Sequence, residues 1–202
     1  MAEQRFMRAS ALASVLRPET WLGASRTAEL VFGERCGWSL VEIAAFAGTE
    51  EVVARKVEGL TGLIAPNSVA IPARGSGNSL IRVGHEKFWV FGSEGSDLAA
   101  RAIATLDPAE AAVTPLSHSR SIITIAGPPV FEVLKKGIAL DFSDAAFPVG
   151  AAAMTGVHHV PVLLIRTGEE SIEVVVLRTF GRTVFEWLLD AGLEFGYRIA
   201  TT

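Results

Sequence analysis

A serine, a histidine and an arginine lie close together at Ser117, His118 and Arg120. A serine can act as a nucleophile when a histidine lies within hydrogen-bond reach of its hydroxyl. Neighbouring strand residues point to opposite faces of a sheet, so Ser117 and His118 are poor partners if the strand includes them. The chain also has no G-x-S-x-G nucleophile elbow. A hydrolase using Ser117 or His118 is therefore ranked low, below a loop or strand start held by serine and arginine hydrogen bonds.

The histidines do not have the spacing of a metal site. His158 and His159 are adjacent, so they could bind one metal only from opposite sides of the chain, and no H-E-x-x-H motif is present. With His85 and His118 they complete the four histidines of the chain. The single Cys36 excludes an internal disulfide and a cysteine-based metal cluster, which fits a cytoplasmic protein. We expect no metal site here, and interpret the histidine pair as a polar strand edge or an interface.

Acidic and glycine-rich segments give no stronger indication of a catalytic or binding site. Asp141 and Asp144 could act as an acid–base pair, but we expect them to cap turns. Gly75 and Gly77 in "PARGSGNS" resemble a phosphate-binding loop only loosely, because no strand directly precedes them and no Walker lysine follows. A flexible loop is expected instead. The sequence therefore predicts no catalytic residue, and it assigns no cofactor-binding residue.

The composition narrows the class of protein. Half of the 202 residues are hydrophobic and 20% are charged, which is apolar for a chain without any apolar run of transmembrane length. The net charge of −4 gives no basic surface for nucleic acid. An apolar excess of this kind indicates sheets buried on both faces or a surface covered by a partner. We expect four tryptophans to be core or interface anchors rather than stacking platforms: Trp21, Trp38, Trp89 and Trp187.

The first part of the chain predicts a strand over 39–48 and a helix over 49–63, with Thr49 as its N-cap. One stripe of this helix is apolar: Val53, Val57, Leu60 and Ile64. Two strands within 78–92 turn near Gly84, and a helix within 93–108 has Ser96 as its cap and Pro108 beyond its end.

The second part repeats this order. A strand over 119–127 ends at a glycine, a helix begins with the two prolines of 128–138, and a hairpin over 158–178 turns at Gly168. The helix over 179–196 is the most strongly patterned element. Its expected buried face is Phe180, Val184, Trp187, Leu188, Ala191 and Phe195, and its outer face is Arg182, Glu186, Asp190 and Glu194.

These elements predict an α+β fold. It has two related strand–helix–strand–strand–helix halves, with helices on one face of largely antiparallel sheets. The expected organisation is an N-terminal arm over 1–35, a first half over 36–108 and a second half over 109–202. The arm is interpreted as a segment that orders only on docking.

Several blocks of the second half resemble one known family. They are "LSHSRSIITIAGPPVFEVLKKGIALDF" (116–142), "AAFPVGAAAMTGVHHVPVLLIR" (145–166) and "LRTFGRTVFEWLLDAGLEFG" (177–196), with "ASALASVL" (9–16) near the start. Together they resemble the gamma subunit of heterotetrameric sarcosine oxidase. That family is itself similar to the folate-binding domain of the glycine-cleavage T-protein, and the two-half organisation is compatible with that fold.

The resemblance implies a role inside a larger enzyme. In that family the alpha subunit carries FAD, NAD and a tetrahydrofolate-binding region. FMN lies between alpha and beta and is attached covalently to beta, and delta binds zinc. The complex oxidises sarcosine, or in relatives another N-methyl amino acid, to the demethylated product. Hydrogen peroxide forms, and the one-carbon unit leaves as formaldehyde or 5,10-methylenetetrahydrofolate.

The resemblance thus implies a non-catalytic gamma subunit without a cofactor of its own. Its partners would be the alpha, beta and delta subunits, and its role would be assembly. The alternative is a stand-alone, T-protein-like module that binds folate. Asp141 is a candidate pterin ligand only because it is an acid in the matching half, so no folate site is assigned to it.

Overall fold

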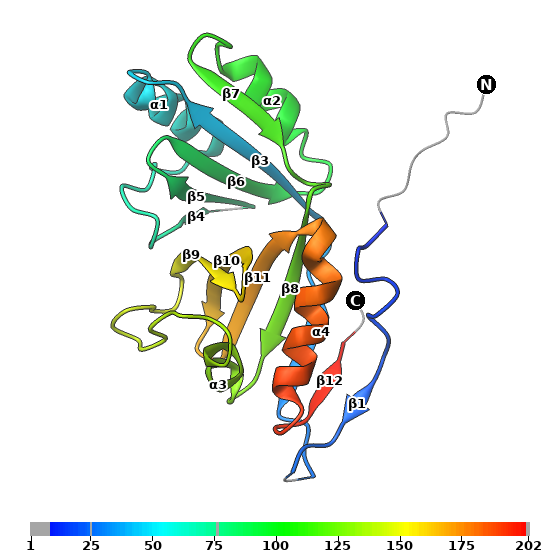
Figure 1. Cartoon of the computed structure of the whole chain (residues 1–202). Helices are drawn as coiled ribbons and strands as arrows, with labels where there is room; N and C mark the ends of the chain where they lie inside the picture. The colour runs from blue at the N-terminus through cyan, green and yellow to red at the C-terminus, as the bar shows by residue number, and fades with distance from the viewer. Residues whose placement is uncertain (1–8, 25, 76, 201–202) are drawn as a thin grey trace, which may run out of the picture.

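The chain folds into two sheets with helices on their outer faces, as Figure 1 shows for the computed structural model. The structure describes residues 9–24, 26–75 and 77–200. The helices are α1 (Glu50–Thr61), α2 (Leu98–Thr105), α3 (Val130–Lys135) and α4 (Gly181–Gly192), with the short 3-10 turn η1 (Arg178–Phe180) before the last. The strands are β1 (Thr20–Trp21), β2 (Leu30–Glu34), β3 (Trp38–Ala45), β4 (Ala73–Gly75), β5 (Asn78–Gly84), β6 (Lys87–Ser93), β7 (Ala111–Pro115), β8 (Arg120–Ala126), β9 (Ala152–Val157), β10 (Val160–Gly168), β11 (Ser171–Leu177) and β12 (Tyr197–Ile199).

The smaller sheet has the order β4-β5-β6-β3-β7, and all its pairs are antiparallel. Helices α1 and α2 contact each other beside it, and α2 packs on β3 and β7. Alternate residues of β3, such as Val41 and Ile43, join Val53 and Val57 of α1 in one buried apolar cluster. The strand period of two therefore places one apolar face of this sheet under the helices.

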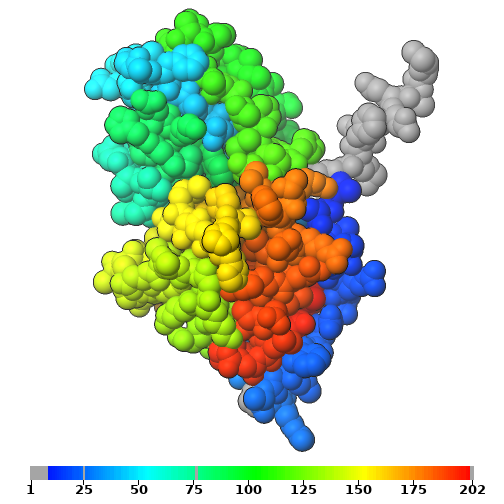
Figure 2. Space-filling view, in the orientation of Figure 1, coloured from blue at the N-terminus to red at the C-terminus, as the bar shows by residue number. Residues whose placement is uncertain are grey.

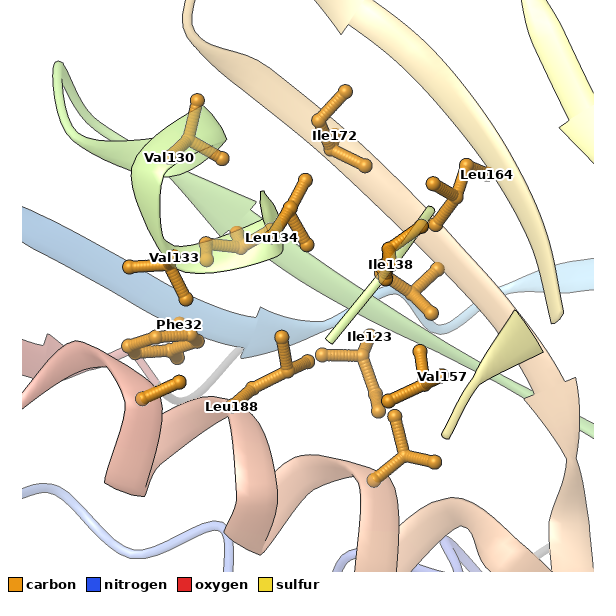
Figure 3. Packing of buried hydrophobic residues seen from close by; sticks show 14 of the residues in the cluster. Phe32, Ile123, Val130, Val133, Leu134, Ile138, Val157, Leu164, Ile172 and Leu188 are labelled. Carbon is orange, nitrogen blue, oxygen red and sulfur yellow. The ribbon is translucent and has the colours of Figure 1, made fainter. Parts of the chain in front are cut away.

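The larger sheet has the order β1-β12-β2-β8-β11-β10-β9. Its pairs are antiparallel except for β12 with β2. Helices α3 and α4 cover one face, and Figure 3 shows side chains from both meeting those of the strands. Leu134 of α3, Leu188 of α4 and Ile123 of β8 are all fully buried in this cluster. The predicted α+β class with largely antiparallel sheets is confirmed.

Each half contributes one strand to the sheet of the other half. The order from β2 to α2, strand–strand–helix–three strands–helix, repeats from β7 to α4. Strand β2, which leads into β3, pairs with β8 in the larger sheet. Strand β7, which leads into β8, pairs with β3 in the smaller sheet. The two halves are therefore interlocked by an exchange of their leading strands.

A third apolar cluster lies between the inner faces of the two sheets. It contains Trp38, Trp89 and Phe91 from the smaller sheet, and Ile122 and Leu163 from the larger one. Central strands are thus apolar on both faces because one face meets helices and the other meets the opposite sheet. This arrangement explains much of the apolar composition within the chain itself.

Three local expectations about the helices were wrong. Phe180 is 42% exposed and precedes α4, whereas Phe185 is fully buried. Ile64 is 82% exposed because α1 ends at Thr61, before that turn of the apolar stripe. The expected cap Ser96 bonds to Ser39, with 3.1 Å between their hydroxyl oxygens, and α2 begins after Asp97 instead.

Thr49 stands at the N-cap position of α1 as predicted, but its hydroxyl makes no capping hydrogen bond to the helix. It donates to the carbonyl oxygens of Phe46 and Glu110, at 2.8 and 2.7 Å. The hydroxyl therefore ties the start of α1 to the residue just before β7, rather than satisfying a free helix N–H group.

Part of the expected N-terminal arm belongs to the larger sheet. Leu30 and Phe32 of β2 are fully buried, and Leu12 is buried in the same cluster. Residues 1–8 of the expected arm lie outside the described residues.

Within the part of the chain that the structure describes, no helix is long and apolar enough to cross a membrane.

Candidate functional site

The segment that carries Ser117, His118 and Arg120 is the crossing from the smaller sheet to the larger one. Strand β7 ends at Pro115 and β8 begins at Arg120. The Ser117 hydroxyl oxygen accepts the Leu40 backbone N–H at 2.9 Å and contacts the Leu40 carbonyl oxygen at 3.3 Å. His118 is exposed. Ser117 thus extends the pairing of β7 with β3 beyond the end of the strand.

Arg120 connects the two sheets through an aromatic ring. Its guanidinium carbon lies 5.2 Å from the ring centre of Trp89 on β6, and the Trp89 indole N–H donates to Glu42 at 2.9 Å. Burial lowers the pKa of Arg120, and the negative charge of Glu42 opposes this. The Arg120 side chain also donates to the Ser119 carbonyl and hydroxyl oxygens, at 3.2 and 3.0 Å. A cation over a tryptophan face is favourable, so this contact helps to hold the two halves together.

A small hollow of about 100 Å³ lies beside this crossing. Three arginines, Arg35, Arg120 and Arg178, and two glutamates, Glu34 and Glu94, are among its lining residues. Glu34 is buried and accepts the Ser10 hydroxyl. The charges are close to balanced, so the arrangement gives no strong preference for a bound anion.

Arg35 and Arg178 fix neighbouring segments. Arg35 lies in the link from β2 to β3 and pairs with Glu173 of β11 at 2.9 Å. Arg178 donates to the Ala9 carbonyl oxygen at 2.6 Å and so holds the N-terminal segment beside η1. A second hollow of about 180 Å³ continues from Arg35 between the sheets, lined by Arg35, Arg74, Ser79, Ile81, Phe91, Ile165, Thr167 and Glu173.

The four histidines are spread over three turns. His158 and His159 occupy the β9–β10 turn, and the ring centre of His158 lies 5.3 Å from that of Trp187. His85 is in the β5–β6 turn. Among the described residues, no group of three histidines, cysteines or acids could hold a metal ion.

The two aspartates have different partners. The Asp141 carboxylate accepts the Ser143 backbone N–H at 2.8 Å, and this hydrogen bond is the main cause that lowers the pKa of Asp141. Asp144 pairs with the buried Arg166 at 2.7 Å. Asp141 is therefore a turn cap, as expected, whereas Asp144 belongs to an ion pair.

The expected loop around Gly75 and Gly77 is a β-hairpin. Gly75 ends β4 and pairs with Asn78 of β5, and Gly77 has a φ of +85° in the turn. Positive φ is accessible to glycine at low cost, which explains its presence at this position. The segment is thus the edge of the smaller sheet.

Sequence reasoning missed Arg166, the most buried charged residue in the part of the chain that the structure describes. Arg166 is only 4% exposed, and it donates to the carbonyl oxygens of Phe147 and Glu169 at 2.7 and 3.1 Å. Its guanidinium lies 4.7 Å from the centre of the Phe131 ring. One feature of the sequence indicates this burial. Arg166 directly follows the apolar run 160–165 within the expected hairpin.

The comparisons with known proteins agree with this fold. A family model described as the GCVT N-terminal domain matches residues 79–202. The sarcosine oxidase gamma subunit of Corynebacterium sp. strain P-1 is 32% identical, over 91% of this chain and 88% of its own length. That of an Arthrobacter species is 31% identical over 91% and 88%.

Solved structures give the same result. The heterotetrameric sarcosine oxidase of Corynebacterium sp. U-96 contains a chain that matches with a TM-score of 0.80 and 26% identity, covering 93% of this chain and 96% of that one. The aminomethyltransferase T of Bartonella henselae matches 80% of this chain and 46% of its own, with a TM-score of 0.54 and 16% identity, which shows a shared fold. On the strength of these matches along nearly its whole length, the chain belongs to the family of sarcosine oxidase gamma subunits.

Proposed function

We propose that this chain is the non-catalytic gamma subunit of a heterotetrameric oxidase that demethylates sarcosine or a related N-methyl amino acid. The products would be glycine or its counterpart, hydrogen peroxide, and the one-carbon unit as formaldehyde or 5,10-methylenetetrahydrofolate. The observation that carries the proposal is the match to sarcosine oxidase gamma subunits over 91% of the chain.

The geometry around the sheet crossing supports a structural role. Ser117 bonds to the backbone of Leu40, and Arg120 lies over Trp89. These side chains, which could do chemistry elsewhere, are committed to joining the two halves. The role of the subunit would then be to stabilise the assembly.

The remaining partners and cofactors are part of the same proposal. Alpha, beta and delta subunits would complete the complex, and FAD, FMN, NAD, tetrahydrofolate and zinc would bind to them. The proposal includes a cytoplasmic location, since a chain with the single Cys36 has no need of an oxidising compartment.

The test is co-expression with the other three subunits encoded by the same organism, with the affinity tag on one of them. We expect the chain to co-purify in stoichiometric amount with flavin-bearing partners and with sarcosine-dependent formation of hydrogen peroxide. Leaving the chain out should lower the yield and the thermal stability of the complex. A complex that assembles with full stability and activity without this chain would contradict the proposal.

A further inference from the structure

Two long connections occupy equivalent places in the two halves. Residues 62–72 join α1 to β4, and residues 136–151 join α3 to β9, so each follows the first helix of its half. Both lie on the left of the molecule in Figure 1, and the same side is seen in Figure 2. The Ala152 backbone N–H donates to the Ala70 carbonyl oxygen at 2.9 Å, which brings the two connections together.

The first connection presents exposed apolar side chains on a backbone held by hydrogen bonds. Ile64 and Ile71 are 82% and 66% exposed. They line a hollow of about 370 Å³ together with Pro66 and Pro72. Arg82 donates to the Pro66 carbonyl oxygen at 2.6 Å, and Glu58 accepts the Ala65 backbone N–H at 2.9 Å. These contacts hold the backbone beside Ile64, and the Ala152–Ala70 hydrogen bond holds the backbone beside Ile71, which lowers the entropy cost of binding a partner.

The second connection forms a hollow with apolar walls and an acidic rim. The hollow measures about 620 Å³, and its apolar lining is Pro128, Phe131, Phe142, Pro148 and Val149. Val149 is 52% exposed. The lining also contains three carboxylates, Asp144, Glu169 and Glu170, against the single guanidinium of Arg166. Asp144 pairs with the buried Arg166, so Glu169 and Glu170 leave the rim with a net negative charge.

We propose that residues 62–72, residues 141–151 and the β10–β11 turn with Glu169 and Glu170, together the two-loop face, dock another subunit of the oxidase. The docked segment would place apolar side chains over Ile64 and Ile71. A lysine or arginine would lay its stem on Val149 and its charge on the acidic rim. This inference rests on the proposed function, because that function supplies the partner.

Charge complementarity favours a different chain over a second copy of this one. Residues 62–72 contain no charged side chain, so the same loop of a second copy offers no cation to the acidic rim. An exposed apolar patch flanked by unbalanced charge is typical of a protein interface rather than of free surface. Loops that a sheet scaffold positions at the surface also commonly carry binding function.

The experiment is co-expression of variants of the full chain with the other three subunits, followed by affinity purification through another subunit. The first variant is Ile71→Asp and the second is the double change Glu169→Lys with Glu170→Lys. Matched controls are Ile103→Asp, an isoleucine 58% exposed on α2, and Asp190→Lys, an exposed acid on α4. Circular dichroism and thermal unfolding of each isolated chain verify the fold.

We expect each two-loop variant to reduce the recovery of this chain in the complex at least tenfold, while both controls are recovered like the wild type. The wild-type recovery should also fall as the salt concentration rises, and the double variant should lose that salt dependence.

A wild-type chain that never joins the other subunits overturns the proposed function itself. A wild-type chain that joins, with two-loop variants that join equally well, overturns only the two-loop face. If Ile71→Asp instead breaks a dimer of the isolated chain and leaves the complex intact, the occupant is a second copy and the inference is wrong.

Discussion

Several hydroxyl, carboxyl and guanidinium groups that could do chemistry bind to the backbone of this chain instead. The Ser117 hydroxyl accepts the Leu40 N–H, and the Asp141 carboxylate accepts the Ser143 N–H. The Arg166 guanidinium donates to the Phe147 carbonyl oxygen. Each of these groups satisfies a backbone atom in a connection or beyond the end of a neighbouring strand, where no ladder partner is available. Residue types alone therefore could not separate a catalytic role from a structural one.

Replacing Ser117 with alanine should destabilise the chain without lowering the turnover of an assembled oxidase. The Leu40 amide would lose its 2.9 Å partner inside the interlocked halves, which costs about 1 kcal/mol when partial exposure admits water. Chemical denaturation measures the stability, and peroxide formation per flavin measures the turnover. His118→Ala is the control, since His118 is exposed and should change stability by less than about 0.5 kcal/mol. A large loss of turnover per flavin in Ser117→Ala would restore the catalytic interpretation.

Asp141 should make folding stability depend on pH in the acid range. The Ser143 amide lowers the pKa of Asp141 in the folded chain below its unfolded value, which is about 3.9. The carboxylate therefore contributes stability that is fully present above about pH 4, and this contribution is lost as the pH falls through the lowered folded pKa. Unfolding free energies measured between about pH 5 and pH 2.5 should fall less steeply in Asp141→Asn than in the wild type. Equal slopes would show that the stability of this turn does not depend on the negative charge of Asp141.

The secondary elements that the sequence predicted well are the long, strongly periodic ones. The β5–β6 and β10–β11 hairpins and α4 occur where alternation or helical spacing placed them. The short strands β1, β4, β7, β9 and β12 and the strand β2 were missed. They lie at or near sheet edges, except β2, and their pairing depends on partners far away in the chain. Their existence is decided by tertiary contacts, which local propensity does not contain.

Gly48 and Gly127, which follow β3 and β8 in the two repeats, test how far the repeat extends. Gly48 has a φ of +85° with open space around its Cβ position, whereas Gly127 has a φ of +131° and a Cβ there would lie 2.0 Å from the Glu29 carbonyl oxygen. We expect Gly48→Ala to cost about 1–2 kcal/mol from backbone strain alone. Gly127→Ala should cost roughly 1–3 kcal/mol more, because the segment before β2 must move. Thermal unfolding of both variants measures the difference. Equal costs would mean that the approach of Glu29 is not tight.

At the scale of the whole molecule, the sequence indicated two related halves but not how they join. Residues 41–57 and residues 121–137 both form a strand followed by a helix, as the repeated order predicted. The exchange of β2 and β7 has no local signature, because it is defined by which distant strand each one meets. For the same reason Arg120 could not be matched with Trp89 from the sequence. The division into an arm and two halves remains a proposal about folding units.

The strand exchange predicts that neither half folds stably alone. A fragment of residues 1–108 lacks β7 and would expose the edge of β3, and a fragment of 109–202 lacks β2 and would expose the edge of β8. Each would also leave half of the inter-sheet cluster around Trp38 and Ile122 open to water. We therefore expect both fragments to show little cooperative unfolding by circular dichroism. Mixed in equal amounts, they should regain the native spectrum, because each supplies the strand that the other lacks.

The intact chain should unfold in one transition, with tryptophan fluorescence and far-ultraviolet circular dichroism coinciding. Two separate transitions, or a fragment that unfolds cooperatively by itself, would show that the halves are independent domains. The strand exchange would then not be required for either half to fold.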